Sequence, residues 1–260
     1  MTQLCQKSSK GKEPITQLSQ PSSMLRAATM LKDINNTKEL WKIAVKVKDI
    51  WQVVKDGKES FELVVVDSKG DDITIIVPHE LNAKFNTLII EKNSYTIQNF
   101  QVLKNDDQFK QSQHQFKLRL TGGTRVFYVN QHDIPYPMAK FKDFLEIEEG
   151  IWRQDFLYDI IGVVDDIGYT QRFQGSKKVQ INFRLRDVSN NKICCTLWEN
   201  YATQLITYMD EKTDAGGTIV CMKYAKIKPA GKFPLTVSNT WTTTKLFIND
   251  KILEILNFQK

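Results

Sequence analysis

Two successive series of short β-rich segments are the feature that most constrains how this 260-residue chain can fold. In residues 41–120, three runs rich in Val and Ile are followed by a short segment with helical spacing and then by two further β-rich runs. Residues 156–238 show the same order. Short strands separated by turn residues indicate an all-β architecture, and the recurrence indicates two units of one kind.

The first series carries the clearest strand signals. Its first three runs are WKIAVKVKDIW, FELVVVD and ITIIVP, and the turn SKGDD joins the second to the third, as in a hairpin. Apolar residues recur at helical spacing in HELNAKFNTLI (79–89), and SYTIQNFQVL and HQFKLRL supply two later strands. Three strands, a helix and two strands is the order of a five-stranded Greek-key OB barrel.

The second series predicts a second barrel of the same type. Its expected strands are 156–166, 178–187, 192–198, 217–228 and 233–238, with a helix over 199–209. The predicted fold class is therefore all-β with short helices, as two tandem OB-fold five-stranded Greek-key barrels. The predicted domains are a disordered arm (1–38), a first OB domain (39–130), a linker (131–150) and a second OB domain (151–260).

Charge and aromatic residues together point to a polyanionic partner. The net charge of +6 favours such a partner only weakly by itself. Residues 159–201 add a basic loop and aromatic side chains within one β-meander, and a groove for single-stranded nucleic acid needs both cations and π surfaces. The candidate binding residues of this stretch are Arg172, Phe173, Lys177, Lys178 and Trp198.

The tryptophans have two interpretations. Trp198 ends a predicted strand beside the basic loop, so we expect it to stack on bases, with a core position as the alternative. The other four tryptophans lie at strand starts or ends, and we interpret them as packing residues: Trp41, Trp51, Trp152 and Trp241.

Signals for catalysis, metals and membranes are missing from the sequence. The four cysteines form no CxxC pair, and the three histidines form no HxxxH or HExxH pattern. The glycine pairs lack the frame of a phosphate-binding loop, and the sequential acidic pairs are interpreted as solvated turn residues. We therefore predict a protein that is not an enzyme and has no cofactor, no metal and no membrane contact, in an intracellular location.

Several motifs resemble a known family. In the second series, DIIGVV, the GSKK loop, the RDVSNNK turn, TLWENYA and TTTKLFIND resemble the second DNA-binding OB domain of the replication protein A large subunit, especially its plant-type versions. This resemblance covers about residues 156–258. In the first series, WKIAVKV, VVVDSKGDDI, YTIQNFQV and HQFKLRL resemble the preceding OB domain of the plant form.

The resemblance implies binding residues in the second barrel. In this family each of the two barrels stacks bases on two aromatic side chains, and Trp198 matches the first of them. Lys226 and Arg172 match basic positions of the groove. The second aromatic position falls on Ala230, and the nearby Phe233 is the expected substitute, with a core role as the alternative.

In the first barrel the same resemblance implies fewer contacts. Phe116 matches one stacking position and Lys110 a nearby contact to the nucleic-acid backbone, while the other aromatic position falls on Pro78. The family's amino-terminal interaction barrel, zinc-containing third domain and carboxy-terminal trimerisation helix have no counterpart here. We therefore expect a shortened relative or a fragment, whose association with other replication protein A-type subunits cannot use that helix.

These observations lead to one functional prediction and one alternative. We predict single-stranded DNA binding with little sequence preference, by an electrostatic groove and base stacking, in nuclear DNA replication, repair or recombination. The alternative is an RNA-binding or protein-interaction OB module that has lost strong DNA binding, which Pro78 and Ala230 would permit.

Overall fold

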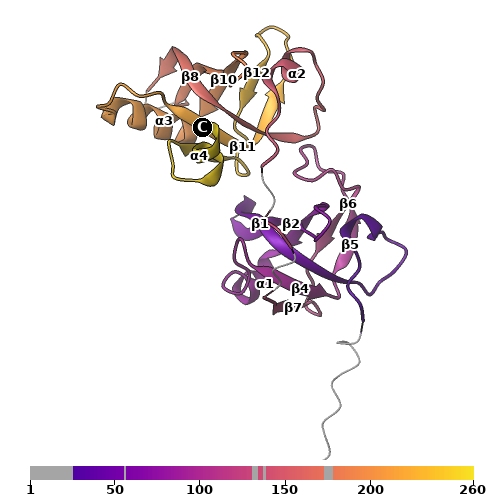
Figure 1. The fold of residues 1–260 in the computed structure, drawn as a ribbon. Helices are drawn as coiled ribbons and strands as arrows, with labels where there is room; N and C mark the ends of the chain where they lie inside the picture. The colour runs from indigo at the N-terminus through magenta and orange to yellow at the C-terminus, as the bar shows by residue number, and fades with distance from the viewer. Residues whose placement is uncertain (1–25, 56, 131–133, 137–138, 173–177) are drawn as a thin grey trace, which may run out of the picture.

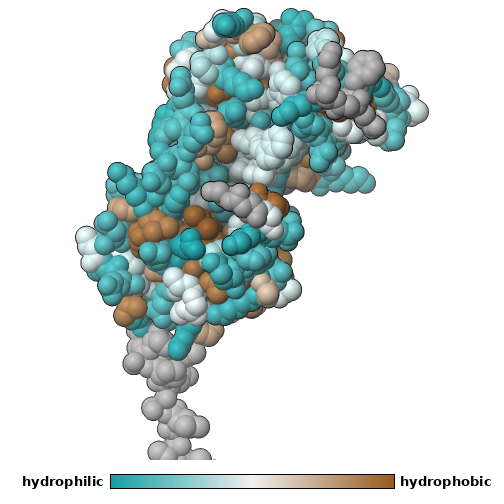
Figure 2. Space-filling view, turned by 180° about the vertical axis from the view of Figure 1, so that it is seen from behind, coloured by the Kyte–Doolittle hydropathy of each residue, from teal (hydrophilic) through white to brown (hydrophobic). Residues whose placement is uncertain are grey.

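The computed structural model describes residues 26–55, 57–130, 134–136, 139–172 and 178–260. It contains two β barrels in succession along the chain, the first in the lower half of Figure 1 and the second in the upper half. Seen from behind in Figure 2, the surface of both barrels is mostly hydrophilic. No helix in the described ranges is long and apolar enough to cross a membrane.

The first barrel is a closed ring of strands. Its elements are η2 (Leu31–Asp33), β1 (Lys42–Lys55), β2 (Lys58–Val66), β3 (Asp72–Val77), α1 (His79–Phe85), β4 (Ser94–Gln98), β5 (Gln101–Lys104), β6 (Phe116–Arg119) and β7 (Arg125–Tyr128). The sheet order is β5-β6-β3-β2-β1-β4-β7. Strands β4 and β5 are two parts of one bent strand, divided where Asn99 adopts a φ of 58°. The ring therefore closes through this bend, and β7 adds to the edge of β4.

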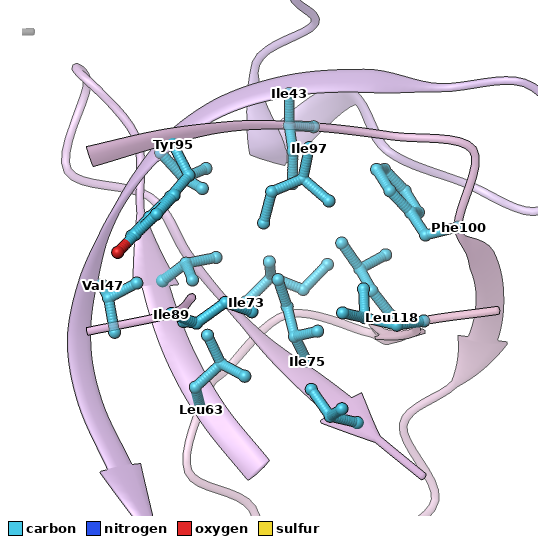
Figure 3. Packing of buried hydrophobic residues seen from close by; sticks show 14 of the residues in the cluster. Ile43, Val47, Leu63, Ile73, Ile75, Ile89, Tyr95, Ile97, Phe100 and Leu118 are labelled. Atoms are coloured by element: carbon cyan, nitrogen blue, oxygen red, sulfur yellow. The ribbon is translucent and has the colours of Figure 1, made fainter. Parts of the chain in front are cut away.

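The core of the first barrel follows from strand alternation. Side chains of Ile43, Val45 and Val47 all point inward from β1 and are fully buried. They pack against apolar residues of the other strands of the ring, as Figure 3 shows for Ile75 and Leu118. Burial of this apolar surface is the main stabilising contribution of the barrel.

The amino-terminal boundary lies earlier than the sequence predicts. Leu31 and Ile34, placed in the expected arm (1–38), are buried in the first core, and the Leu31 amide donates a hydrogen bond to Asp67 Oδ2 at 2.8 Å. The last part of the expected arm therefore belongs to the core of the first barrel. Residues 1–25 of the arm lie outside the described residues.

The second barrel repeats this plan. Its elements are α2 (Phe144–Glu148), β8 (Leu157–Gln171), β9 (Gln180–Arg186), β10 (Lys192–Trp198), α3 (Glu199–Glu211), β11 (Ile219–Lys228), β12 (Thr236–Ser238), β13 (Lys245–Ile248) and α4 (Leu253–Phe258). The order is β12-β10-β9-β8-β11-β13, and a further pairing of β12 with β11 closes a five-stranded ring. In both barrels the third strand pairs in parallel with the strand after the loop: β3 with β6, and β10 with β12. The predicted tandem OB fold is confirmed.

The segment expected as a linker (131–150) contributes to the second core. Helix α2 begins after Asp143, whose Oδ1 accepts the Leu145 amide at 2.8 Å as an N-cap. Phe144 and Ile147 are buried among the residues of the second barrel. The helix spans five residues, and its exposed residues include Glu146 and Glu148, which explains why its sequence looks like a linker. The core of the second barrel therefore begins before residue 151.

A buried junction joins the two barrels. The Tyr224 hydroxyl of β11 donates to Asp49 Oδ2 of β1 at 2.9 Å, and Lys245 lies 3.1 Å from Asp49 Oδ1. Burial raises the pKa of Tyr224 well above its ordinary value, and Asp49 raises it further. The Tyr224 amide donates to Asp159 Oδ1 at 2.9 Å, and burial raises the pKa of that carboxyl. Tyr224 has a φ of 56°, a strained conformation that these partners hold in place.

Candidate nucleic-acid interface

A groove of about 750 Å³ crosses one face of the second barrel. Its floor comes from outward-facing residues of β9 and β10, including Asn182, Cys194 and Thr196. Its rim is the loop 229–235 between β11 and β12. Gly168 of β8 lies against Asn182 and leaves the floor without a large side chain at that point. The groove is open to solvent and has room for flat ligands.

Two aromatic side chains face this groove. Phe233 on the loop is 79% exposed, so its ring is accessible to a ligand in the groove. Trp198 is half-buried at the end of β10, and the Lys228 ammonium lies 5.6 Å from its ring centroid. The Trp198 amide donates to Asn239 Oδ1 at 2.8 Å, and the chain turns sharply at Glu199, with a φ of 55°. This turn positions the indole at the groove.

Three cations accompany the aromatics along the groove. They are Arg184, Lys228 and Lys232. Burial lowers the pKa of Lys228 below its ordinary value, and the nearby Lys226 lowers it further. Arg184 pairs with Asp166 at 3.2 Å, with both side chains about half exposed. A phosphate at this groove would meet several cations, and it would offset the repulsion between Lys228 and Lys226.

Sequence reasoning assigned three other lysines and arginines to binding, and each has a partner in the structure. Lys110 forms an ion pair with Asp155 at 2.7 Å, and Lys226 lies 4.8 Å from the Phe109 ring; both belong to the junction between the barrels. Hydrogen bonds from Arg153 and Lys110 hold the pKa of Asp155 well below its usual range. Arg172 forms an ion pair with Asp210 of α3. The structure therefore does not bring these cations into the groove of Trp198 and Phe233.

Phe116 occupies a different environment from Trp198. It is half-buried at the start of β6, on the same side of the strand as the core residue Leu118, and its ring lies 6.0 Å from that of His114. Its contact with nucleic acid stays a prediction. Phe173 and Lys177 lie outside the described residues.

Lys178 and Trp241 form a pair that the sequence did not suggest. Trp241 was interpreted as a packing residue, but it is 76% exposed, so that interpretation is wrong. The Lys178 ammonium lies 4.9 Å from the Trp241 ring, a cation–π contact. Trp241 lies two residues after Asn239, which binds the Trp198 backbone, so this pair adjoins the Trp198 end of the groove.

Sequence reasoning missed Arg184, Lys228 and Lys232. All three line the groove. Arg184 lies at an alternate, outward position of β9, and the alternation of QINFRLR would have identified it. Lys228 and Lys232 flank the loop that carries Phe233, and their proximity to an exposed aromatic depends on the folded loop.

Metal ligands do not gather anywhere in the described parts of the chain: no group of three or more His, Cys, Asp or Glu side chains there is placed to hold an ion. Burial raises the pKa of the Cys195 and Cys221 thiols, and Cys194 is exposed. The interface therefore consists of aromatic rings, cations and polar strand residues.

Comparisons with known proteins place this fold. Residues 32–150 match a family described as "Domain of unknown function DUF223". No curated protein sequence matches the chain. Among solved structures, the chain resembles one in a replication protein A heterotrimer bound to single-stranded DNA, with a TM-score of 0.56, 20% identity, and coverage of 89% of this chain and 54% of that chain. The chain thus spans about half the length of that protein.

Two further solved structures are more distant. A murine DNA-binding protein bound to double-stranded DNA has a TM-score of 0.46 and 14% identity, covering 81% of this chain and 97% of that one. The Ifi202 HINa domain with 20-bp double-stranded DNA has a TM-score of 0.45 and 13% identity, covering 79% and 95%. The likeness to the replication protein A chain, at 20% identity, shows the fold alone: the chain has tandem OB folds.

Proposed function

We propose that this protein binds single-stranded DNA with little sequence preference through the groove of the second barrel. The observation that carries the proposal is that Phe233, 79% exposed, and Trp198 line one groove together with Lys228 and Lys232. Unpaired bases stack on such rings whatever their identity, at about 1–3 kcal/mol per base. The replication protein A chain of similar fold, in a heterotrimer bound to single-stranded DNA, supports the choice of ligand.

Each chemical part of the ligand has a counterpart in the groove. Phosphates meet Lys228, Lys232 and Arg184, and binding releases the counterions condensed on the strand. Bases meet the rings of Trp198 and Phe233. The polar floor residues Asn182 and Thr196 offer hydrogen bonds without a rigid pattern, which is consistent with low sequence preference. Binding requires no catalytic step, and we propose none. Action in nuclear DNA replication, repair or recombination is part of the same proposal.

A titration tests the ligand class. Fluorescence anisotropy with labelled oligo-dT, oligo-U and duplex DNA should show preference for the single strands, because stacking needs bases free of partners. Affinity should fall with salt at a log–log slope of about −0.7 per neutralised phosphate. Equal or tighter duplex binding, or a slope near zero, would contradict the mechanism. A clear preference for oligo-U would shift the proposal to RNA.

A pair of matched variants tests the groove itself. Lys232→Gln should weaken oligo-dT binding and reduce the magnitude of the salt slope by about 0.7. Lys251→Gln removes the same charge from an exposed position outside the groove lining and should change neither quantity. Equal effects of the two variants would indicate attraction by net charge alone.

A further inference from the structure

The groove of the second barrel has a counterpart in the first. Asp67 and Asp187 each accept backbone amides in the turn after the second strand of their barrel, which aligns the two hairpins. By this alignment and the strand pairings, Val64 corresponds to Arg184 and Thr74 to Cys194. By the same alignment, Pro78 of the first barrel corresponds to Trp198 of the second. The groove residues of the second barrel can therefore be compared position by position with residues on the equivalent face of the first.

This face is closed in the first barrel. Arg184 and Cys194 are exposed, whereas Val64 is 0% and Thr74 is 1% exposed. Val64 cannot owe its burial to the barrel interior, because its neighbours Leu63 and Val65 already point inward. Other parts of the chain must cover it.

The loop 105–115 between β5 and β6 is the first cover. Lys117 follows the loop and points outward beside Thr74, since the next residue, Leu118, points into the core. It is only 8% exposed, and its ammonium lies 2.6 Å from Asp107 and 3.7 Å from Asp106. Two carboxylates thus occupy the position where phosphates would meet this cation.

Hydrogen bonds hold the same loop in this position. The Asn105 side chain donates to the backbone carbonyls of Ser112 and His114, at 3.4 and 3.0 Å. The Ser112 hydroxyl donates to Asp72 Oδ1 at 2.6 Å. The corresponding loop of the second barrel, 229–235, is shorter and leaves its groove open.

The second barrel is the other cover. Trp51 and Val64 pack in one cluster with Leu157 and Tyr224 of the second barrel, and the Trp51 and Tyr224 rings lie 5.5 Å apart. Phe109 of the loop packs beside this cluster. The loop and the second barrel therefore close the face together, and Figure 1 shows the loop rising toward the second barrel.

We propose that this face of the first barrel is held closed by its own chain: Asp106 and Asp107 form ion pairs with Lys117 in place of nucleic-acid phosphates, whereas the equivalent face of the second barrel is an open groove. The ligand class rests on the proposed function, but the closure does not. Thr74 Oγ1 is buried and has no hydrogen-bond partner in the described residues, so closure leaves one polar atom unsatisfied. Release of the loop would return this atom to water and free a cation for a longer strand.

Thiol accessibility tests the closure without nucleic acid. In a Cys5→Ser background, Thr74→Cys introduces a thiol at the position equivalent to Cys194, which serves as the exposed standard. Each site's reaction with a bulky maleimide is followed by peptide mass spectrometry. We expect Cys194 to react readily and the thiol at position 74 to react at least about tenfold more slowly, because reaction there requires local opening. Equal rates at the two positions would overturn the proposal.

Charge removal then tests the carboxylates. Adding Asp106→Asn and Asp107→Asn should accelerate labelling at position 74, whereas Glu148→Gln with Glu149→Gln makes the same charge change at exposed positions and should not. Cys195 and Cys221 are buried and should stay unlabelled, which excludes global unfolding as the cause. No acceleration by the Asp106 and Asp107 substitutions would overturn the role of the loop.

Oligo-dT titrations complete the test. Lys117→Gln should leave the affinity of the whole chain unchanged, since Asp106 and Asp107 already form ion pairs with this lysine. Asp106→Asn with Asp107→Asn should raise the affinity and steepen the salt slope by about 0.7, the share of one added phosphate. Weakening by Lys117→Gln as large as by Lys232→Gln would overturn the closure. Absence of any wild-type binding would instead refute the proposed function and leave the labelling result intact.

Discussion

The two barrels share one strand plan but present opposite surfaces at equivalent positions. In the second barrel, Arg184 and Cys194 stand open in a groove of about 750 Å³. In the first, Val64 and Thr74 are buried beneath a loop and the neighbouring barrel. The difference arises from the loop before the last strand of the ring, which is long and acidic in one barrel and short and basic in the other. Whether this face of an OB barrel can contact a ligand therefore depends on which parts of the chain cover it.

The largest expected effect concerns the boundary of the open barrel. A fragment of residues 151–260 lacks Phe144 and Ile147, which fill the second core, whereas residues 139–260 retain them. Loss of one buried Phe side chain alone costs about 3–5 kcal/mol, so the shorter fragment should be less stable by at least that amount. Urea unfolding followed by circular dichroism measures the difference. Equal stability would show that α2 is a linker after all.

The longer fragment also tests whether the open barrel binds alone. Residues 139–260 retain Trp198, Phe233 and their lysines, and should bind oligo-dT without the first barrel. If this fragment is folded and does not bind, the first barrel takes part in binding, and the contrast drawn between the two faces is wrong.

The next effect concerns the junction that closes the first barrel. Tyr224→Phe removes the hydroxyl that donates to the buried Asp49 carboxylate. A hydrogen bond to a charged group contributes roughly 1.5–3 kcal/mol, and unfolding free energy should fall by about that amount. Tyr169→Phe, at an exposed tyrosine, is the matched control and should stay within about 0.5 kcal/mol of wild type. Equal stability of both variants would show that the junction does not contribute to folding.

A smaller effect compares the equivalent positions Trp198 and Pro78. Trp198→Ala should weaken oligo-dT binding by roughly 1–3 kcal/mol with folding largely retained, because the half-buried indole is a stacking surface. Pro78→Ala, in the closed barrel, should not change the affinity. Melting temperature and affinity are measured on the same samples. A stability loss of about 3–5 kcal/mol for Trp198→Ala would instead assign the indole to the core.

The smallest effect is a pH dependence of the open groove. The pKa of Lys228 is lowered by burial and by Lys226, while a bound phosphate favours the charged ammonium and raises it. Binding therefore takes up a proton, and affinity is full below the pKa of the free protein and declines as pH rises through it. Lys228→Arg keeps its charge and should remove this decline in titrations at alkaline pH. A decline of equal size in that variant would assign it to another group.

Part of the candidate site was predictable from local sequence. Trp198 ends a strand whose alternation is clear and lies near the basic loop, so the sequence indicated a stacking role for it. Phe233 was suggested only by the family resemblance, with a core role as the alternative, and it was expected in a strand over 233–238, whereas it lies in the loop before β12. Lys110 and Lys226 were also predicted to contact nucleic acid, but in the structure they contact Asp155 and Phe109 at the junction between the barrels. Their partners lie in the other barrel or its loop, and local sequence contains no information about such contacts.

The sequence by itself determined the strand order, the inward faces and the repetition of one barrel, because alternation and turn residues act over a few neighbouring positions. Only the tertiary structure decided which face stays open. Val64 and Lys117 look like ordinary strand residues in the sequence, and they are buried because Asp107 and Tyr224 fold over the same face. Charged and aromatic side chains that are distant along the chain come into contact only in the folded protein. These contacts cover one face of the first barrel, while the equivalent face of the second barrel stays open to solvent.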